Sequence, residues 1–182
     1  MHRPMVSVFL AVSLDGFIAG EGGDLSWLSP YASDPPEATG YAALMRETDA
    51  MVMGRNTYDA VLGFGPWPYE GKRVVVLTGR ELRPRHGEER ADVPLHALLR
   101  DLGKAGHRHV YLDGGAVVRD GLRAGLVDSL TLSRAPVVLG KGIALFDQDL
   151  PRATWRMHST RSLPSGLVQT RYLANLAKTG DA

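Results

Sequence analysis

Short apolar runs that end at a glycine or polar turn recur along this 182-residue chain and constrain its fold more than any other feature. The β-branched run 73–78 stops at a glycine, and the run 109–112 leads through an Asp-Gly-Gly turn into a helix-like segment. Residues 6–12 and 50–53 have the same strand-like character. Repeated strand, turn and helix units are typical of an α/β protein with a mostly parallel sheet.

Helical spacing of apolar residues predicts the elements between these strands. We expect helices over 37–47, over 56–62 with Asn56 as its cap, and over 93–105, where leucines recur at i, i+3 and i+4. The charged stretch 81–92 is typical of a surface connection. Residues 127–133 and 137–139 are strand-like, and 154–163 and 167–173 flank a Pro-Ser-Gly turn, the pattern of an antiparallel hairpin.

These elements predict one domain over residues 1–182, with a mixed, mostly parallel sheet flanked by helices and a C-terminal antiparallel hairpin. With 21 Lys and Arg against 20 Asp and Glu, the net charge of +1 gives no reason to expect a nucleic acid or a membrane as partner. The apolar run 5–14 is too short for a membrane helix, so we expect a cytoplasmic protein.

Several kinds of catalytic site lack support in the sequence. The chain has no cysteine, and His107 and His109 have no third ligand at a recognisable spacing, so we expect no metal site. Neither a G-x-S-x-G elbow nor a phosphate-binding P-loop occurs, and neither Gly-x-Gly pair has the third glycine of the dinucleotide fingerprint.

Three turns after predicted strands are candidates for a ligand site, because parallel sheets bind ligands at the carboxyl ends of their strands. They are residues 54–57, 78–80 and 113–116. Arg55 and Arg80 stand at two of these ends, where a guanidinium can fork onto the 2′-phosphate of NADP. Two alternatives stay open: the glycines only tighten their turns, and each arginine is only a solvated surface charge.

The ordered motifs resemble a known family. They are Ser13-Leu14-Asp15-Gly16, Met53-Gly54-Arg55-Asn56-Thr57, Leu77-Thr78-Gly79-Arg80, Asp113-Gly114-Gly115 and Pro136-Val137-Val138-Leu139-Gly140-Lys141-Gly142. Together they resemble the dihydrofolate-reductase-like superfamily. The first and last are more similar to the reductase domain of bacterial riboflavin-biosynthesis deaminase/reductases than to dihydrofolate reductase proper.

This resemblance implies NADPH as cofactor, and it implies which residues bind it. The implied contacts are Ala11, Gly16, Gly54, Arg55, Asn56, Thr57, Thr78, Gly79, Arg80, Asp113, Gly114, Gly115, Ala116 and Val117. Ala11 would meet the nicotinamide, the residues 78–80 the adenosine ribose phosphate, and the two glycine turns the pyrophosphate.

The substrate side rests on weaker signals. Glu37 stands four residues before Tyr41, as a carboxylate stands before an aromatic residue in dihydrofolate reductases, so Glu37 is a candidate to assist proton delivery. An acidic residue is also favoured in any first helical turn. The further candidates are Ser133 and Asp15 as catalytic residues, and Trp27, Tyr41 and Arg134 as contacts of the substrate.

The expected function is that of an NADPH-dependent 5-amino-6-(5-phosphoribosylamino)uracil reductase. The alternatives are reduction of dihydrofolate, and a nucleotide-binding module of the same fold without turnover. The partner is a small-molecule substrate, and a homodimer is possible.

Overall fold

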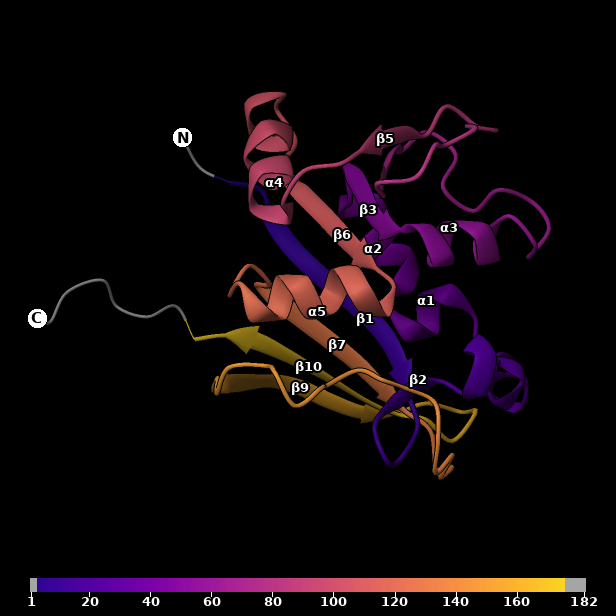
Figure 1. Cartoon of the computed structure of the whole chain (residues 1–182). Coiled ribbons are helices and arrows are strands. Elements are labelled where there is room, and N and C mark those ends of the chain that lie inside the picture. The colour runs from indigo at the N-terminus through magenta and orange to yellow at the C-terminus, as the bar shows by residue number, and fades with distance from the viewer. Residues whose placement is uncertain (1–2, 176–182) are drawn as a thin grey trace, which may run out of the picture.

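The computed structural model describes residues 3–175 and contains one large sheet (Figure 1). Its strands lie in the order β5-β4-β3-β6-β1-β7-β10-β9. Their bounds are β1 Met5–Val12, β3 Ala50–Gly54, β4 Arg73–Leu77, β5 Glu89–Ala91, β6 His109–Asp113, β7 Ser129–Arg134, β9 Trp155–Ser162 and β10 Val168–Ala174. The strands from β5 to β7 are parallel, whereas β10 is antiparallel to β7 and β9. The mostly parallel sheet with a C-terminal antiparallel hairpin is confirmed.

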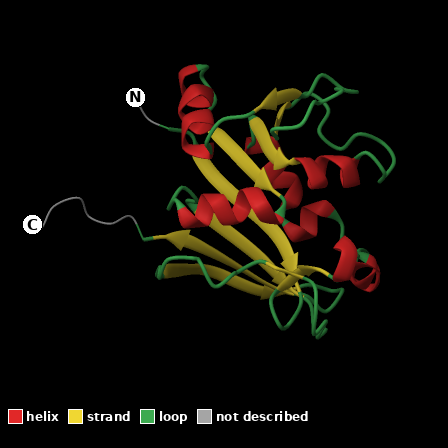
Figure 2. Cartoon of the chain, in the orientation of Figure 1, coloured by secondary structure: helices red, strands yellow, loops and turns green. Residues whose placement is uncertain are grey.

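Helices cover both faces of the sheet (Figure 2). On one face, α4 (Leu95–Lys104) and α5 (Gly115–Arg123) bury their apolar residues with Val6, Val8 and Val110 of the central strands. On the other face, α2 (Tyr41–Glu47) and α3 (Arg55–Val61) pack against Met51, Met53 and Tyr111. Because side chains alternate along a strand, β1 sends alternate residues into each layer. This double burial explains why the central strands are continuous apolar runs.

Two helices differ from the sequence expectation. The prediction of a single helix over 37–47 is wrong. Gly40 has a left-handed backbone conformation, with φ 79°, and it separates α1 (Pro36–Thr39) from α2. Helix α3 begins at Arg55 with Gly54 as its N-cap, so Asn56 lies inside the first turn and is not the cap.

The strand assignments differ at the loops. Residues 89–91 of the charged connection form β5, a parallel edge strand beside β4. Residues 137–139 form no strand; they instead hold the 13–16 loop, since Leu14 N–H donates to the Val137 carbonyl. A second, two-stranded sheet joins β2 (Phe17–Ala19) to β8 (Ile143–Ala144), and the 3₁₀ helices η1 (Glu21–Gly23) and η2 (Ser26–Tyr31) follow β2. No helix within residues 3–175 has the length and apolar character needed to cross a membrane.

Candidate active site

A cleft of about 800 Å³ lies at the carboxyl ends of β1, β3 and β6. Two of the three turns singled out in the sequence line it: Gly54, Arg55, Asn56 and Thr57 after β3, and Asp113, Gly114, Gly115, Ala116 and Val117 after β6. Ala11 of β1 lines it as well. The cleft therefore lies where parallel α/β sheets bind their ligands.

The turn after β6 requires glycine for reasons within the protein. Gly114 has φ 90°, a conformation that side-chain-bearing residues rarely adopt. A Cβ at Gly114 would also overlap Thr57, and one at Gly115 would lie 2.5 Å from Ile18 Cδ1. Gly114 thus lets the β6–α5 turn approach the start of α3 closely, and Gly115 lets it approach β2.

The first turn of α5 supplies hydrogen-bond donors to the cleft. The backbone N–H groups of a helix's first turn have no partner within the helix, and Gly114, the N-cap, provides no side-chain cap. Gly115, Ala116 and Val117 carry such groups and all line the cleft. These donors and the positive end of the helix dipole suit a phosphate group.

The third turn, after β4, lies beside the cleft. Arg80 donates to Asn56 Oδ1 at 3.4 Å, and the Thr78 hydroxyl accepts the Arg80 N–H at 3.1 Å. Arg90 of β5 holds the carbonyls of Gly79 and Arg80 at 3.0 and 2.9 Å. Arg80 is exposed, and its other guanidinium donors are available to a ligand.

Arg55 is less free than Arg80. Its Nε bonds Asp59 at 2.8 Å and its Nη1 donates to the Glu81 carbonyl at 2.7 Å. Arg55 therefore ties α3 to the segment after β4. The remaining nitrogen, Nη2, has no hydrogen-bond partner in the described part of the chain.

A half-buried carboxyl lies on the cleft floor. Tyr69 donates its hydroxyl hydrogen to Asp113 Oδ2 at 3.0 Å, and both residues line the cleft. Burial raises the pKa of Asp113, opposed by the hydrogen bond from Tyr69. The pKa of Asp113 is therefore higher than that of an ordinary surface aspartate, so Asp113 keeps its proton to a higher pH.

Three tyrosines surround Asp113. Burial, with the nearby Asp113 carboxyl as a second cause, raises the pKa of Tyr41 to about 12 and raises the pKa values of Tyr69 and Tyr111 further. Tyr41 and Tyr69 line the cleft, so they present neutral phenol groups to it at neutral pH. Asp113 is therefore the acidic group of this cluster.

The residues expected to be catalytic lie away from the cleft lining. Glu37 is exposed on α1, while Tyr41, four residues later, reaches the cleft. Ser133 is buried and accepts a hydrogen bond from Gln169 at 3.0 Å. Asp15 accepts hydrogen bonds from Ser13 Oγ and from the backbone N–H groups of 139 and 140, which lower its pKa to about 2. Asp15 thus fastens two loops and stays ionised.

The other predicted contacts are also placed by the structure. Trp27 is buried with Leu163 and Leu167, and its indole nitrogen has no hydrogen-bond partner within residues 3–175. Gly16, at φ 89°, turns the loop after β1, and Arg134 is exposed at the end of β7.

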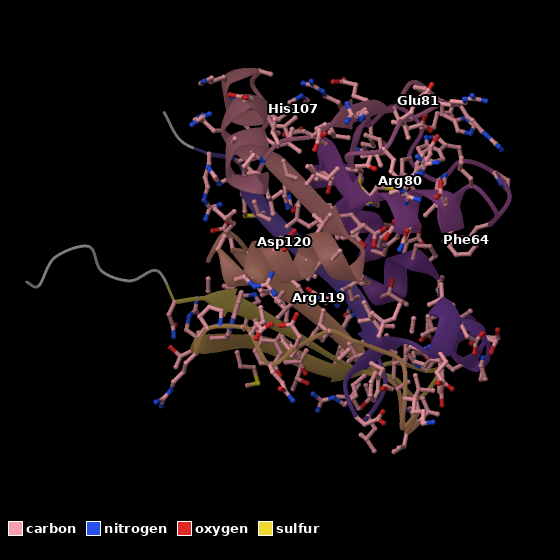
Figure 3. The ribbon with its side chains drawn as sticks, viewed as in Figure 1. Phe64, Arg80, Glu81, His107, Arg119 and Asp120 are labelled. Carbon is pink, nitrogen blue, oxygen red and sulfur yellow. The ribbon has the colours of Figure 1, made fainter. Side chains whose placement is uncertain are left out.

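Sequence reasoning missed several residues of the cleft. Arg119 of α5 and Phe64 after α3 line it, and Figure 3 shows them on different elements. Tyr69, in a Pro- and Gly-rich loop, has no spacing relation to Asp113 that a sequence pattern could reveal. Arg90, which holds the turn after β4 rather than lining the cleft, lies in the charged stretch 81–92 that the sequence predicts as a surface connection.

This arrangement fits a phosphate-bearing dinucleotide. It offers a cleft of about 800 Å³, N–H groups at the start of α5 that have no partner within the helix, and the exposed guanidinium of Arg80. Within residues 3–175, no cluster of three His, Asp or Glu side chains could hold a metal ion.

Residues 4–169 match the model of the RibD C-terminal domain. The chain belongs to the RibD C-terminal domain family. The resemblance seen in the motifs is thereby confirmed.

Relatives span the chain almost completely. The uncharacterized Bacillus subtilis (strain 168) protein YwjB is 30% identical over 178 residues, covering 95% of this chain and 99% of that protein. The riboflavin biosynthesis protein RibD of Corynebacterium ammoniagenes is 28% identical over 169 residues, 82% of this chain and 48% of that protein. The chain therefore matches about half the length of this RibD.

Solved structures share the fold. A protein from Shewanella sp. PV-4 whose name places it in riboflavin biosynthesis is 35% identical with a TM-score of 0.84, covering 94% of this chain and 99% of that one. A dihydrofolate reductase from Enterococcus faecalis complexed with NADP(H) is 18% identical with a TM-score of 0.67, covering 94% and 96%. The latter likeness shows that the fold is that of dihydrofolate reductase.

Proposed function

We propose that this protein is an NADPH-dependent reductase that transfers a hydride to a small pyrimidine- or pterin-type substrate, similar to 5-amino-6-(5-phosphoribosylamino)uracil reductase. The observation that carries the proposal is the meeting of the two glycine turns around one cleft whose floor holds Asp113. Membership of the RibD C-terminal domain family supports a reductase.

The cofactor would lie against the glycine turns. Gly115, Ala116 and Val117 would receive the pyrophosphate, while Arg80 and Thr78 would receive the 2′-phosphate beside β4. When bound, NADPH supplies the hydride. The chain's own task is then to orient the substrate, exclude water and provide a proton.

Asp113 is our candidate for the proton donor. Its carboxyl lines the cleft, burial raises its pKa, and Tyr69 fixes its orientation at 3.0 Å. A carboxylic acid held in this way can protonate a nitrogen or oxygen of the substrate as the hydride arrives. Tyr41 and Leu10, which also line the cleft, would supply apolar surface for a flat heterocycle.

The proposal is tested by following NADPH oxidation with purified protein and two substrates. We expect faster turnover with the deaminated phosphoribosylaminouracil than with dihydrofolate. Efficient reduction of dihydrofolate with no response to the pyrimidine would reverse the substrate ranking. Tight NADPH binding without turnover of either substrate would support the nucleotide-binding module instead.

A further inference from the structure

A second cavity, of about 370 Å³, lies on the same sheet face as α1 and α2, and we call it the strand groove. Its floor is formed by residues of β1 and β7, and its two sides by α1–α2 and by the β9–β10 hairpin. Phe9 lines the groove and Tyr41 lines the cleft, with ring centroids 5.6 Å apart. This aromatic pair separates the groove from the candidate active site.

Buried polar residues are concentrated in the strand groove. Eight polar or charged residues are buried in the described part of the chain, and four of them line it: Ser7, His109, Ser129 and Gln169. They come from four adjacent strands. Burying a polar side chain costs free energy unless it is hydrogen-bonded, and all four of these residues are hydrogen-bonded through their side chains.

Some of these hydrogen bonds orient two arginines. Arg171 Nε donates to Ser129 Oγ at 3.0 Å, and Arg161 Nε and Nη2 donate to Gln169 Oε1 at 3.0 and 2.8 Å. Both terminal nitrogens of Arg171 and Nη1 of Arg161 have no hydrogen-bond partner within residues 3–175. The guanidinium groups are therefore held in place with donors left over.

The strand register brings these two arginines within reach of one ligand. Arg171 pairs with Ser159, and Arg161 pairs with Gln169, so the arginines are diagonal neighbours on one face of the hairpin. Diagonal neighbours have Cα atoms about 7–8 Å apart, within the reach of long side chains. One small anion can bridge two guanidinium groups at this separation.

The groove has more positive than negative charge. Neither Arg161 nor Arg171 forms an ion pair in the described part of the chain, and Arg171 is half-buried. Glu47, on α2, is the acidic residue among those that line the groove. A half-buried cation without a counter-ion is costly, and an anion from solution would offset that cost.

We propose that the strand groove binds a phosphate-type oxyanion, either free phosphate or the phosphomonoester of a small metabolite, between Arg161 and Arg171. Ser7 Oγ on the floor is hydrogen-bonded to His109 Nε2 at 2.7 Å, whereas the Thr131 hydroxyl has no side-chain hydrogen bond within residues 3–175 and can donate to the anion. This inference does not depend on the proposed reductase activity, because the groove and the cleft are separate cavities.

The test is calorimetric titration of the full chain with inorganic phosphate and, in a second arm, with ribose 5-phosphate, at constant ionic strength set by chloride. We expect saturable binding of at least one of them, weakened about tenfold or more in Arg171→Gln and in Arg161→Gln. A preference for ribose 5-phosphate would identify a phosphomonoester as the ligand, and a preference for inorganic phosphate would identify free phosphate; equal binding would show that the groove recognises the phosphate group alone.

Two control variants localise the binding. Arg156→Gln changes an exposed arginine on the same strand as Arg161 that does not line the groove, and Arg80→Gln removes the guanidinium beside the cleft. Arg156→Gln should bind phosphate as the wild type does, and in Arg80→Gln, which alters only the cleft, the binding that depends on Arg171 should persist. Loss of binding in Arg80→Gln but not in Arg171→Gln, or no saturable binding of either probe, would overturn the proposal. Arg161 is exposed, so Arg161→Gln leaves the core intact and tests the groove even if Arg171→Gln does not fold.

Discussion

Replacement of Asp113 by asparagine tests the role of the cleft's carboxyl most sharply. Asparagine keeps the shape of the side chain and an oxygen that accepts the Tyr69 hydroxyl, whose bond to Asp113 measures 3.0 Å. The change therefore removes the proton and little else. General acid catalysis contributes about 100-fold or more, so kcat should fall by about 100-fold, or about 2.7 kcal/mol in activation free energy.

The pH dependence of the rate gives an independent signature. Because burial raises the pKa of Asp113, the wild-type rate should fall as pH rises through that raised value and the acid loses its proton. The asparagine variant should lack this step. NADPH affinity, measured by fluorescence titration, should stay within about twofold of the wild type, since uniform binding is not affected.

The folding stability of the wild type should depend on pH through Asp113. A carboxyl whose pKa is raised on folding binds its proton more tightly in the folded state, so the wild type loses stability as pH rises from the ordinary aspartate value through the raised one. Asp113→Asn should not show this loss, and thermal unfolding at several pH values checks it. A variant with wild-type kcat and an unchanged pH–rate profile would refute the assignment of Asp113.

Four further changes test other parts of the site. Arg80→Ala should weaken NADPH about tenfold or more while NADH binds as before, because only NADPH carries the 2′-phosphate; equal losses in titrations of both would contradict the contact. Gly114→Ala should lower the free energy of unfolding by about 1–3 kcal/mol, since φ is 90° and Thr57 fills the space; unchanged denaturant unfolding would show that the turn adapts. Glu37→Gln should leave kcat and NADPH affinity unchanged, because this exposed residue lies away from the cleft lining; a fall of about 100-fold in steady-state kcat would restore it as an acid. Arg134→Ala should raise KM for a phosphoribosyl substrate if this exposed arginine meets the phosphate, and an unchanged KM would leave it a solvated surface charge.

The strands of this fold could be predicted from sequence because burial on both faces makes them apolar and glycines end them. β4 shows this clearly, as a run of valines between an arginine and a turn. β5 escaped prediction because a three-residue edge strand of Glu, Arg and Ala carries no apolar pattern. The sequence pattern could not predict the break at Gly40, because the apolar spacing of residues 41–45 is that of a continuous helix. The backbone at Gly40 is nevertheless left-handed.

The cleft was only partly predictable for a similar reason. Parallel strands bring their carboxyl ends to one edge, so the turns after β3 and β6 could be expected together. The pairing of Tyr69 with Asp113 and the strand groove depend on contacts between segments far apart in the sequence, such as Ser129 with Arg171. Local patterns carry no information about such contacts.

Hydride transfer itself can be measured with NADPH that carries deuterium at the transferable position of the nicotinamide. After incubation with the deaminated phosphoribosylaminouracil, mass spectrometry of the product should show one deuterium per reduced molecule. The Asp113→Asn variant should form the same labelled product about 100-fold more slowly. A product without deuterium, or no product while NADPH is bound, would contradict the proposal that this chain is an NADPH-dependent reductase.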